Sequence, residues 1–187
     1  LSSNGDLEKP SSIFVTNDGE IYVTNYETNN VRKNDGSSWS TIADSSNGIE
    51  NPTDLWVTEN KTIYIVYNGN GTSGGGVIKK GPDDSDWSNL DLTFSYAAAD
   101  GAPLSIKVLE DGNIYVLSSY GDGYLAKKDS EGNWSTIAKS ADFDNRIIVD
   151  FDVNSNGDVY LANSTYIMKK KENETNWVVF ATNGIDN

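Results

Sequence analysis

Short apolar runs separated by polar turns follow one another along the whole chain. In residues 12–25, the run 13–15 is separated from the run 21–23 by the pair Asp18-Gly19. Runs of three or four β-branched and aromatic residues favour strands, and an Asp-Gly pair supplies the positive φ angles of a tight turn. The pattern therefore predicts a β-hairpin. Two such short strands are not stable alone in water, so further strands must cover them.

The hairpin recurs three more times along the sequence. Its second run carries a central tyrosine, and the spacings are 42, 51 and 45 residues between Tyr22, Tyr64, Tyr115 and Tyr160. An apolar pair precedes each turn: Ile13/Val15, Leu55/Val57, Ile106/Val108 and Phe151/Val153. Self-similarity at such a period indicates a repeat architecture, in which each unit buries its apolar residues against its neighbours.

Each copy continues with two more runs and shows no helical periodicity. The third run carries basic residues, in segments 31–33, 78–80, 126–128 and 168–170. A tryptophan opens the fourth: Trp39, Trp87, Trp134 and Trp177. Four strands per unit predict an all-β fold, a β-propeller of four-stranded antiparallel blades with four repeats in this chain. We expect a single domain over residues 1–187, with blades at approximately 10–51, 52–102, 103–147 and 148–187.

A glycine-rich stretch, residues 68–76, lengthens one connection of the second unit. No helix follows it, so it lacks the helix N-terminus on which phosphate-binding loops depend. We therefore expect residues 74–76 to lie in a flexible loop that takes no part in nucleotide binding.

Charge and composition exclude several classes of partner and of chemistry. The formal net charge is -14, from 28 acidic and 14 basic residues, so the chain should repel nucleic acids and anionic membranes. No run approaches the roughly 20 apolar residues of a membrane span, and we expect no membrane insertion. The sequence holds no cysteine and no histidine. This excludes disulfides, thiol nucleophiles, Cys/His zinc sites and triads that use imidazole.

The first unit carries the most complete repeat motif. It reads Pro10-x-x-Ile13-x-Val15-x-x-Asp18-Gly19-x-Ile21-Tyr22-Val23-Thr24-Asn25, followed by Asn29-Asn30-Val31-Arg32-Lys33. This motif resembles the NHL repeat and related propeller families, including the gluconolactonase group. The likeness covers nearly the whole chain, although the second unit lacks the Asp-Gly turn and the fourth lacks the proline. The resemblance implies a propeller fold but no single activity, because such propellers serve as ligand platforms, scaffolds and enzymes.

Two aspartates are candidate metal ligands in the channel that the inner strands should surround. Ser12, Asp54, Ser105 and Asp150 share one strand phase, directly before the apolar pair. In the lactonases that this sequence resembles, carboxylate and amide oxygens bind a divalent ion there, which makes Asp54 and Asp150 weak candidates. Only two acids occupy the set and neither is a glutamate. We therefore expect aspartates that are solvated or hydrogen-bonded at strand entries.

A second metal candidate begins at Asp152. Oxygen-bearing side chains alternate as at the start of a calcium loop in Asp152-x-Asn154-x-Asn156-Gly157-Asp158. The twelfth position is Asn163 instead of a bidentate glutamate, and the aligned segments of the other units are plain hairpin turns. We expect a turn here as well, with no cofactor and no catalytic residue; a bound divalent cation is the alternative.

Five sequons mark candidate N-glycosylation sites: Asn60, Asn70, Asn133, Asn163 and Asn173. A chain this rich in asparagine, serine and threonine contains about that many by chance, so their number carries no weight. The tryptophan that recurs in each unit offers a surface for stacking sugars. A residue repeated at one position of every blade more often packs against the adjacent blade, and we expect packing.

Both ends of the sequence lie at the same phase of the repeat. Residues 2–5 match 45–48, and residues 182–187 match 46–51. A further unit fits directly after the last one. We therefore expect either a ring that closes after four blades or a longer array, with self-association of copies end to end into a ring or a filament.

These observations predict a secreted, extracellular repeat protein without catalytic activity, acting as a binding or structural scaffold for a protein or glycan ligand. One alternative is a metal-dependent lactonase-like hydrolase, in which an ion held by Asp54 and Asp150 polarises a carbonyl and activates water. The other is a sugar-binding lectin, which needs exposed ring faces of tryptophan or tyrosine.

Overall fold

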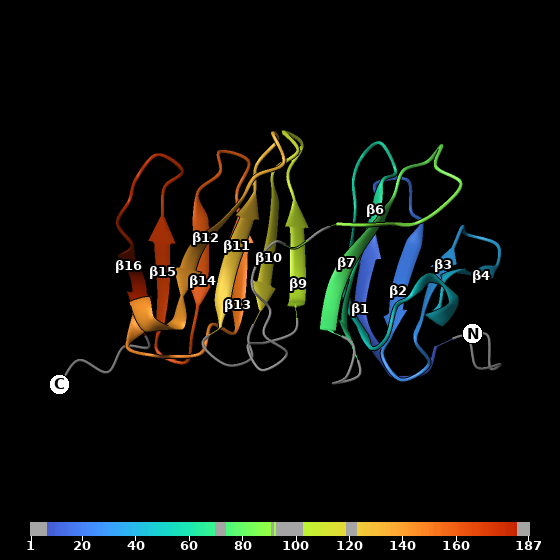
Figure 1. Cartoon of the computed structure of the whole chain (residues 1–187), viewed down its shortest axis with the longest axis horizontal. Helices are drawn as coiled ribbons and strands as arrows, with labels where there is room; N and C mark the ends of the chain where they lie inside the picture. The colour runs from blue at the N-terminus through green and yellow to red at the C-terminus, as the bar shows by residue number, and fades with distance from the viewer. Residues whose placement is uncertain (1–6, 70–73, 91, 93–102, 119–122, 183–187) are drawn as a thin grey trace.

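The computed structural model describes residues 7–69, 74–90, 92, 103–118 and 123–182. In these residues four separate four-stranded antiparallel sheets follow one another along the chain, each with its strands in sequence order (Figure 1). This confirms the all-β propeller architecture with four blades. Helical segments within the described residues are two short 3-10 turns, η1 (Ser45–Asn47) and η2 (Ser140–Phe143). None of the helices found there has the length and apolar character to cross a membrane.

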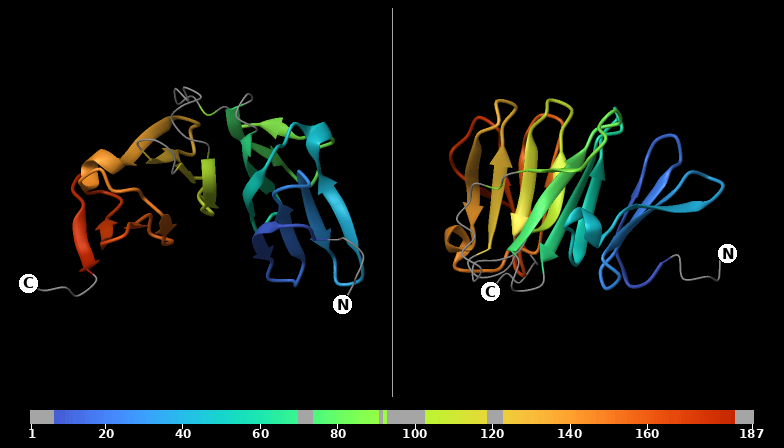
Figure 2. Two further views of the ribbon diagram at one scale, coloured as in Figure 1. Left: turned by 90° about the horizontal axis from the view of Figure 1, so that it is seen from below. Right: turned by 45° about the vertical axis from the view of Figure 1, so that its right-hand side comes forward.

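The strands of the four blades have the following bounds. Blade 1 contains β1 (Pro10–Val15), β2 (Ile21–Asn25), β3 (Asn30–Asn34) and β4 (Trp39–Ala43). Blade 2 contains β5 (Pro52–Val57), β6 (Ile63–Gly69), β7 (Gly74–Lys80) and β8 (Ser88–Asn89). Blade 3 contains β9 (Pro103–Val108), β10 (Ile114–Ser118), β11 (Tyr124–Lys128) and β12 (Trp134–Lys139). Blade 4 contains β13 (Asp150–Val153), β14 (Val159–Ala162), β15 (Tyr166–Lys170) and β16 (Val178–Thr182). The blades form an open arc with the first strand of each on the concave side (Figure 2).

The first hairpin of every blade closes through the same kind of turn. In blade 1 the Thr16 amide donates to the Glu20 carbonyl at 3.0 Å, and the Gly19 amide donates to the Thr16 carbonyl at 2.9 Å. Gly19 adopts a φ of 87°, as the Asp-Gly pair predicts. Blade 2 lacks this glycine, and Lys61 adopts a φ of 65° instead. A side chain in the left-handed region is strained, so contacts of Lys61 must hold it there.

The prediction of a loop at residues 74–76 is wrong. These glycines begin β7, where Gly76 pairs with Tyr67 of β6, and the connection itself, residues 70–73, lies outside the described residues. A Cβ atom at Gly75 would lie 2.5 Å from the Tyr67 carbonyl oxygen and 2.7 Å from Pro103 Cδ. Glycine therefore allows β6 and the next blade to approach the β7 backbone closely, which a composition-based reading does not reveal.

Neighbouring blades pack on each other through apolar faces. We call the face toward the preceding blade the leading face and the face toward the following blade the trailing face. The trailing face of blade 1 meets the leading face of blade 2 through Tyr22, Val31 and Ala43 against Leu55, Val57, Ile65 and Ile78. The next interface joins Val66 and Val77 to Ile106, Val108, Ile114 and Val116. The third joins Tyr115, Leu117, Leu125 and Ala138 to Val153, Val159 and Leu161.

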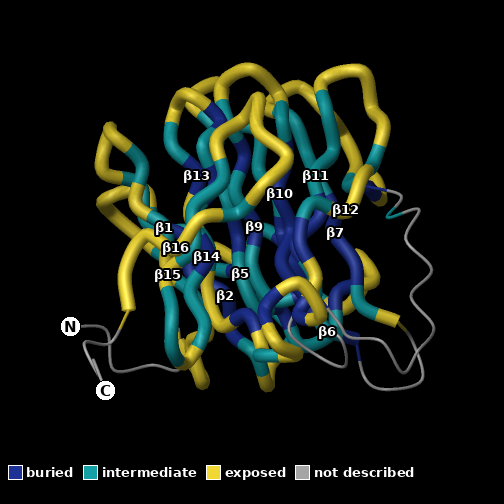
Figure 3. The backbone as a smooth tube through the Cα atoms, turned by 90° about the vertical axis from the view of Figure 1, so that its left-hand side faces the viewer, coloured by how far each residue is buried: buried dark blue, intermediate teal, exposed yellow. Residues whose placement is uncertain are grey.

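Burial follows this stacking. Buried segments lie in the middle strands of the array, and exposed segments lie at the turns (Figure 3). Three of the repeated tryptophans, Trp87, Trp134 and Trp177, are half-buried and pack against these interface cores. The prediction that they serve packing is confirmed for these three.

In blades 1, 3 and 4, a lysine of the third strand covers the repeated tyrosine. Lys33 Nζ lies 5.4 Å from the centre of the Tyr22 ring, and Lys169 Nζ lies 5.0 Å from that of Tyr160. An acid neutralises each of these three lysines: Lys33 Nζ lies 2.6 Å from Glu20, Lys127 Nζ 2.6 Å from Glu172, and Lys169 Nζ 2.8 Å from Asp158. The basic third run thus belongs to the fold of the blade and is no phosphate-binding patch.

Candidate functional site

One side chain from each inner strand contacts its counterpart in the neighbouring blade. The rings of Phe14 and Trp56 meet edge to face, with centroids 5.1 Å apart and an interplanar angle of 64°. Lys107 Nζ lies 5.7 Å from the centre of the Trp56 ring and forms an ion pair with Asp152. We call these four residues the inner row. It is aromatic in blades 1 and 2 and charged in blades 3 and 4.

Asp54 lies next to the inner row and ties three blades together. Ser12 Oγ donates to Asp54 Oδ1 at 2.6 Å, and the Ile106 amide donates to Asp54 Oδ2 at 3.0 Å. The amide of Leu55 donates to Oδ1 at 2.9 Å. Burial raises the pKa of Asp54, and the charge of Asp150 raises it further, against the effect of these hydrogen bonds. Both oxygens are therefore engaged between blades, as expected for a hydrogen-bonded aspartate at a strand entry.

The other two candidate metal ligands, Asp150 and Asp152, each have a contact of their own. Asp150 is exposed, and its Oδ1 accepts a hydrogen bond of 2.9 Å from the Phe151 amide of its own strand. The carboxylate of Asp152 forms the ion pair with Lys107. Within the described ranges, no three acidic side chains gather in a group that could hold a metal ion.

The segment that resembles the start of a calcium loop forms the turn between β13 and β14. Asn154 Oδ1 accepts hydrogen bonds from the amides of Asn156 and Asp158, at 3.0 and 2.9 Å. Asp158 Oδ2 lies 2.8 Å from Lys169 Nζ, and this hydrogen bond lowers the pKa of Asp158. The oxygens that alternate in the sequence thus serve turn closure and an ion pair.

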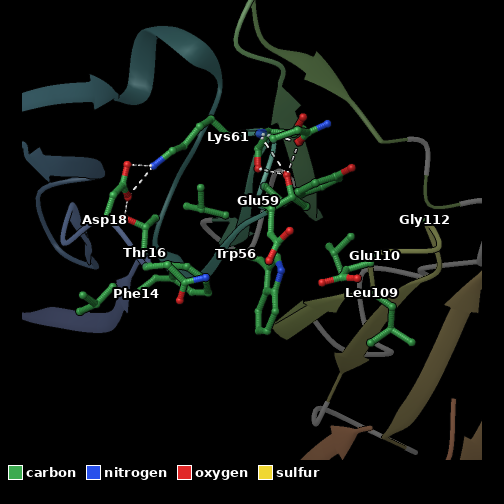
Figure 4. A pocket seen from close by; sticks show the side chains of 17 residues that line it. Phe14, Thr16, Asp18, Trp56, Glu59, Lys61, Leu109, Glu110 and Gly112 are labelled. Atoms are coloured by element: carbon green, nitrogen blue, oxygen red, sulfur yellow. Dashed lines mark hydrogen bonds and ion pairs between the residues drawn. The ribbon is translucent and has the colours of Figure 1, made fainter. Parts of the chain in front are cut away.

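A cleft of about 680 Å³ opens at the turn end of the first three inner strands. This volume lies within the range typical of ligand sites, roughly 300 to 1,000 Å³. Its aromatic lining residues are Phe14, Trp56 and Tyr64. Charged residues line it as well: Asp18, Glu59, Lys61 and Glu110. Figure 4 shows Asp18 and Lys61 facing each other on one side of the cleft and Glu110 on the other.

Lys61 links blades 1 and 2 at the edge of this cleft. Its Nζ lies 2.6 Å from each Oδ atom of Asp18 and 2.9 Å from Glu20 Oε2. The hydrogen bond from Lys61 lowers the pKa of Asp18 to about 2, and hydrogen bonds from Lys33 and Lys61 lower that of Glu20. These contacts explain how the positive φ of Lys61 is held.

The cleft is lined by three carboxylate groups and one ammonium group. Asp18 is paired with Lys61, whereas no lysine or arginine of the described residues pairs with the exposed Glu59 or Glu110. The cleft therefore combines an aromatic wall with two free negative charges. Such a site suits a ligand that is partly apolar and positively charged.

Four of the five sequons lie in the described part of the chain. Asn60 is exposed in the turn beside the cleft, and Asn133 and Asn173 are exposed in the connections that precede β12 and β16. Asn163 is half-buried between β14 and β15, and Asn70 lies outside the described residues. These positions are compatible with glycosylation, which stays a prediction.

The inner row, and with it the aromatic wall of the cleft, was not predicted from the sequence. Phe14, Trp56, Lys107 and Asp152 each stand between the two members of the repeated apolar pair. The flanking positions are apolar in every unit, whereas this position changes from aromatic to basic to acidic. A repeat position that varies between constant neighbours is not fixed by the blade itself, and this variation can be read in the alignment of the four units.

Comparison with known proteins gives matches by structure alone. No family model matches the sequence, and no curated protein does. A solved nidogen/laminin complex matches with a TM-score of 0.71 and 14% identity, over 92% of this chain and 64% of that chain. Virginiamycin B lyase from Staphylococcus aureus matches with a TM-score of 0.69 and 12% identity, over 98% and 58%. A gluconolactonase from Xanthomonas campestris matches with a TM-score of 0.68 and 13% identity, over 91% and 61%.

The chain thus spans less than two thirds of the length of each of these neighbours. Their activities differ, and identities of 12 to 14% show a common fold without showing a common activity. The resemblance that the repeat motif predicts is confirmed at this level. The chain has a β-propeller fold similar to those of the nidogen/laminin, virginiamycin B lyase and gluconolactonase structures.

Proposed function

We propose that this chain is a non-catalytic, extracellular propeller module that binds a cationic, partly apolar peptide segment of a protein partner. The binding site is the cleft at the turn end of blades 1 to 3. The observation that carries the proposal is the presence in one cleft of the Phe14–Trp56 wall together with the free carboxylates of Glu59 and Glu110.

The chemistry of the cleft matches that of a basic peptide. Aromatic rings give large contact area at low entropic cost, and their faces attract the cationic groups of lysine and arginine. A carboxylate that binds a guanidinium or ammonium group adds a charge-assisted hydrogen bond. The net charge of -14 steers positively charged partners toward the protein and repels acidic ones.

A non-catalytic role is supported by the contacts of the residues that an enzyme would use. Both oxygens of Asp54 tie blades together, so a metal ion would have to break those hydrogen bonds. Thr16 Oγ1 donates to Asp18 Oδ1 at 2.5 Å, which has the form of a nucleophile beside a base. The same contact recurs between Thr58 and Asn60 at 2.6 Å, where no acid is present. It is therefore a feature of the turn.

The solved structures support both the proposal and its rival. The nidogen/laminin match is a complex between proteins, whereas the lyase and gluconolactonase matches are enzymes. The lactonase-like alternative expects a divalent ion at Asp54 and Asp150 and hydrolysis that is lost in Asp54→Asn. The lectin alternative expects sugars to stack on Trp56 and Tyr64.

Mass spectrometry of protein from its native source tests the extracellular assignment, since occupied sequons require passage through a secretory pathway.

Selection from a displayed library of random dodecapeptides tests the proposal, with affinities then measured by fluorescence anisotropy. We expect enriched peptides to carry lysine or arginine beside an aromatic or aliphatic residue. Trp56→Ala should weaken binding by about tenfold or more, which is about 1.4 kcal/mol. Glu110→Gln should weaken it less and reduce its dependence on salt. Trp39→Ala, outside the cleft, is the matched control and should leave affinity unchanged.

Failure to enrich any peptide, or peptides whose affinity is the same in Trp56→Ala and in Trp39→Ala, would contradict the proposal. Hits on a glycan array that Trp56→Ala abolishes would favour the lectin. Metal-dependent hydrolysis of a lactone by the purified chain, abolished in Asp54→Asn, would favour the enzyme.

A further inference from the structure

The first blade exposes two side chains that the later blades bury at the same repeat position. Ile13 and Val15 on the leading face of blade 1 are 66% and 56% exposed. Five of their six counterparts are at most 5% exposed: Leu55, Val57, Ile106, Val108 and Val153. The sixth, Phe151, is half-buried. A shallow groove of about 300 Å³ lies beside them, lined by Leu7, Pro10, Ile13 and Val23 among others. The leading face of blade 1 therefore has the shape and composition of an interface without a partner blade.

The last blade exposes the other half of such an interface. Ile167 on the trailing face of blade 4 is 40% exposed, whereas its counterparts are at most 1% exposed: Val31, Val77 and Leu125. Phe180 is 61% exposed and packs edge-on against Tyr160, with ring centroids 5.5 Å apart. Ala181 is exposed as well, although the alanines at its position in two earlier blades are buried: Ala43 and Ala138.

These two faces are the two partners of a contact that the chain already makes three times. At each internal interface, the trailing face of one blade packs on the leading face of the next. Among the described residues, no blade packs on the leading face of blade 1 or on the trailing face of blade 4. Both lie at the ends of the open arc (Figure 2). Contiguous exposed apolar surface of this kind marks an interaction site.

We propose that two copies of this chain join head to tail into a closed ring. The trailing face of blade 4 in each copy packs on the leading face of blade 1 in the other, so that Ile167 and Phe180 cover Ile13 and Val15. A contact between two different faces repeats until the ring closes, and two copies related by a twofold axis along the channel form two equal contacts. Each copy supplies four blades, so the closed ring contains eight.

The leading face of blade 1 differs from its internal counterparts in one way that fits an interface between separate chains. Arg32 stands where the other blades carry Ile78, Ala126 and Met168. Its Nη1 lies 3.3 Å from Thr41 Oγ1 on the neighbouring strand. A charged group on this face keeps the free chain hydrated before it associates, whereas its counterparts Ile78 and Ala126 are buried between blades.

Analytical ultracentrifugation over a range of protein concentrations tests the proposal. We expect the wild-type chain to sediment with twice the mass of the monomer. Ile13→Glu and Ile167→Glu should each raise the dissociation constant of the dimer at least tenfold, because each places a charge in an apolar contact. Both residues are exposed in the single chain, so each variant should fold, which circular dichroism checks. Thr28→Glu, in an exposed turn of blade 1, is the control and should remain dimeric. Salt should strengthen association, since it screens the repulsion between two chains of charge -14.

Mixing the two face variants distinguishes head-to-tail contact from a symmetric one. Ile13→Glu keeps an intact trailing face, and Ile167→Glu keeps an intact leading face. These two faces can still form one contact, so the mixture should contain heterodimers, whereas each variant alone should stay monomeric. A wild-type chain that stays monomeric at every concentration overturns the proposal. So does a dimer that both face variants leave intact, a dimer that only one of them disrupts, or an open polymer that keeps growing with concentration.

Discussion

Replacing Asp54 by alanine should lower the free energy of unfolding by about 2 kcal/mol. The carboxylate accepts two hydrogen bonds from other blades, from Ser12 Oγ at 2.6 Å and from the Ile106 amide at 3.0 Å. Hydrogen bonds to a charged group contribute roughly 1.5 to 3 kcal/mol each, and a buried amide left without an acceptor costs about 1 to 3 kcal/mol. The raised pKa of Asp54 shows that desolvation of the carboxylate offsets part of this gain.

Asp150 provides the matched control, because it occupies the same repeat position in blade 4. It is exposed, and its side chain accepts only from the amide of Phe151 in its own strand. Asp150→Ala should therefore cost less than about 1 kcal/mol. Urea unfolding followed by tryptophan fluorescence measures both. Equal losses in the two variants, or a loss below about 0.5 kcal/mol for Asp54→Ala, would refute the assignment of Asp54 as a tie between blades.

The pH dependence of the same site has a defined sign. The pKa of Asp54 is raised above its ordinary value of 3.8, so the folded state binds the proton more tightly than the unfolded state does. This contribution to stability is fully present below pH 3.8 and is lost as the pH rises through the folded pKa. Asp54→Asn cannot ionise, so the stability of the wild type relative to this variant should decrease over that window. An increase would contradict the direction of the shift.

Three further predictions follow, two of which compare a pair of variants and one of which uses a pH titration. Leu55→Ala should lower the free energy of unfolding of the monomer, measured in urea, by about 2 to 5 kcal/mol. Ile13→Ala, at the same repeat position but exposed, should lower it by less than about 1 kcal/mol. Gly75→Ala should lower the free energy of unfolding by about 1 to 3 kcal/mol, because its Cβ atom would lie 2.5 Å from a backbone carbonyl oxygen. Gly74→Ala is the control and should be tolerated, because no atom lies within 4 Å of the Cβ position there. The pKa of Asp18 is lowered to about 2, so its contribution is present above pH 3.8 and lost as the pH falls through 2, which a carboxyl NMR titration follows.

The fold was predictable because its determinants are local and repeated. The Asp-Gly turn, the apolar pair before it and the tyrosine after it recur in units of similar length, and each has a direct physical reason to form a hairpin. The repeated tryptophan also revealed its role, since a residue that recurs in every blade packs between blades. Trp87 and Trp177 do so in the structure.

The contacts between blades were not predictable from any single unit. Nothing in the sequence of the second unit indicates that Lys61 adopts a φ of 65°, because the ion pair that holds it comes from Asp18 of another blade. Ile13 and Leu55 are equivalent in the pattern, yet one is 66% exposed and the other 2%. The difference depends on whether a blade precedes them. The cleft likewise requires the meeting of Phe14 and Trp56 from two units.

The central claim is that a peptide binds beside Trp56. Fluorine NMR of protein labelled with 5-fluorotryptophan tests it most directly, because the chain has five tryptophans and Trp56 alone lines the cleft. Trp56→Phe assigns its resonance. On titration with the tightest peptide from the selection, we expect a saturable shift of the Trp56 resonance and no shift of the resonances of the four repeat tryptophans. A shift confined to those four, with Trp56 unchanged at saturation, would contradict it.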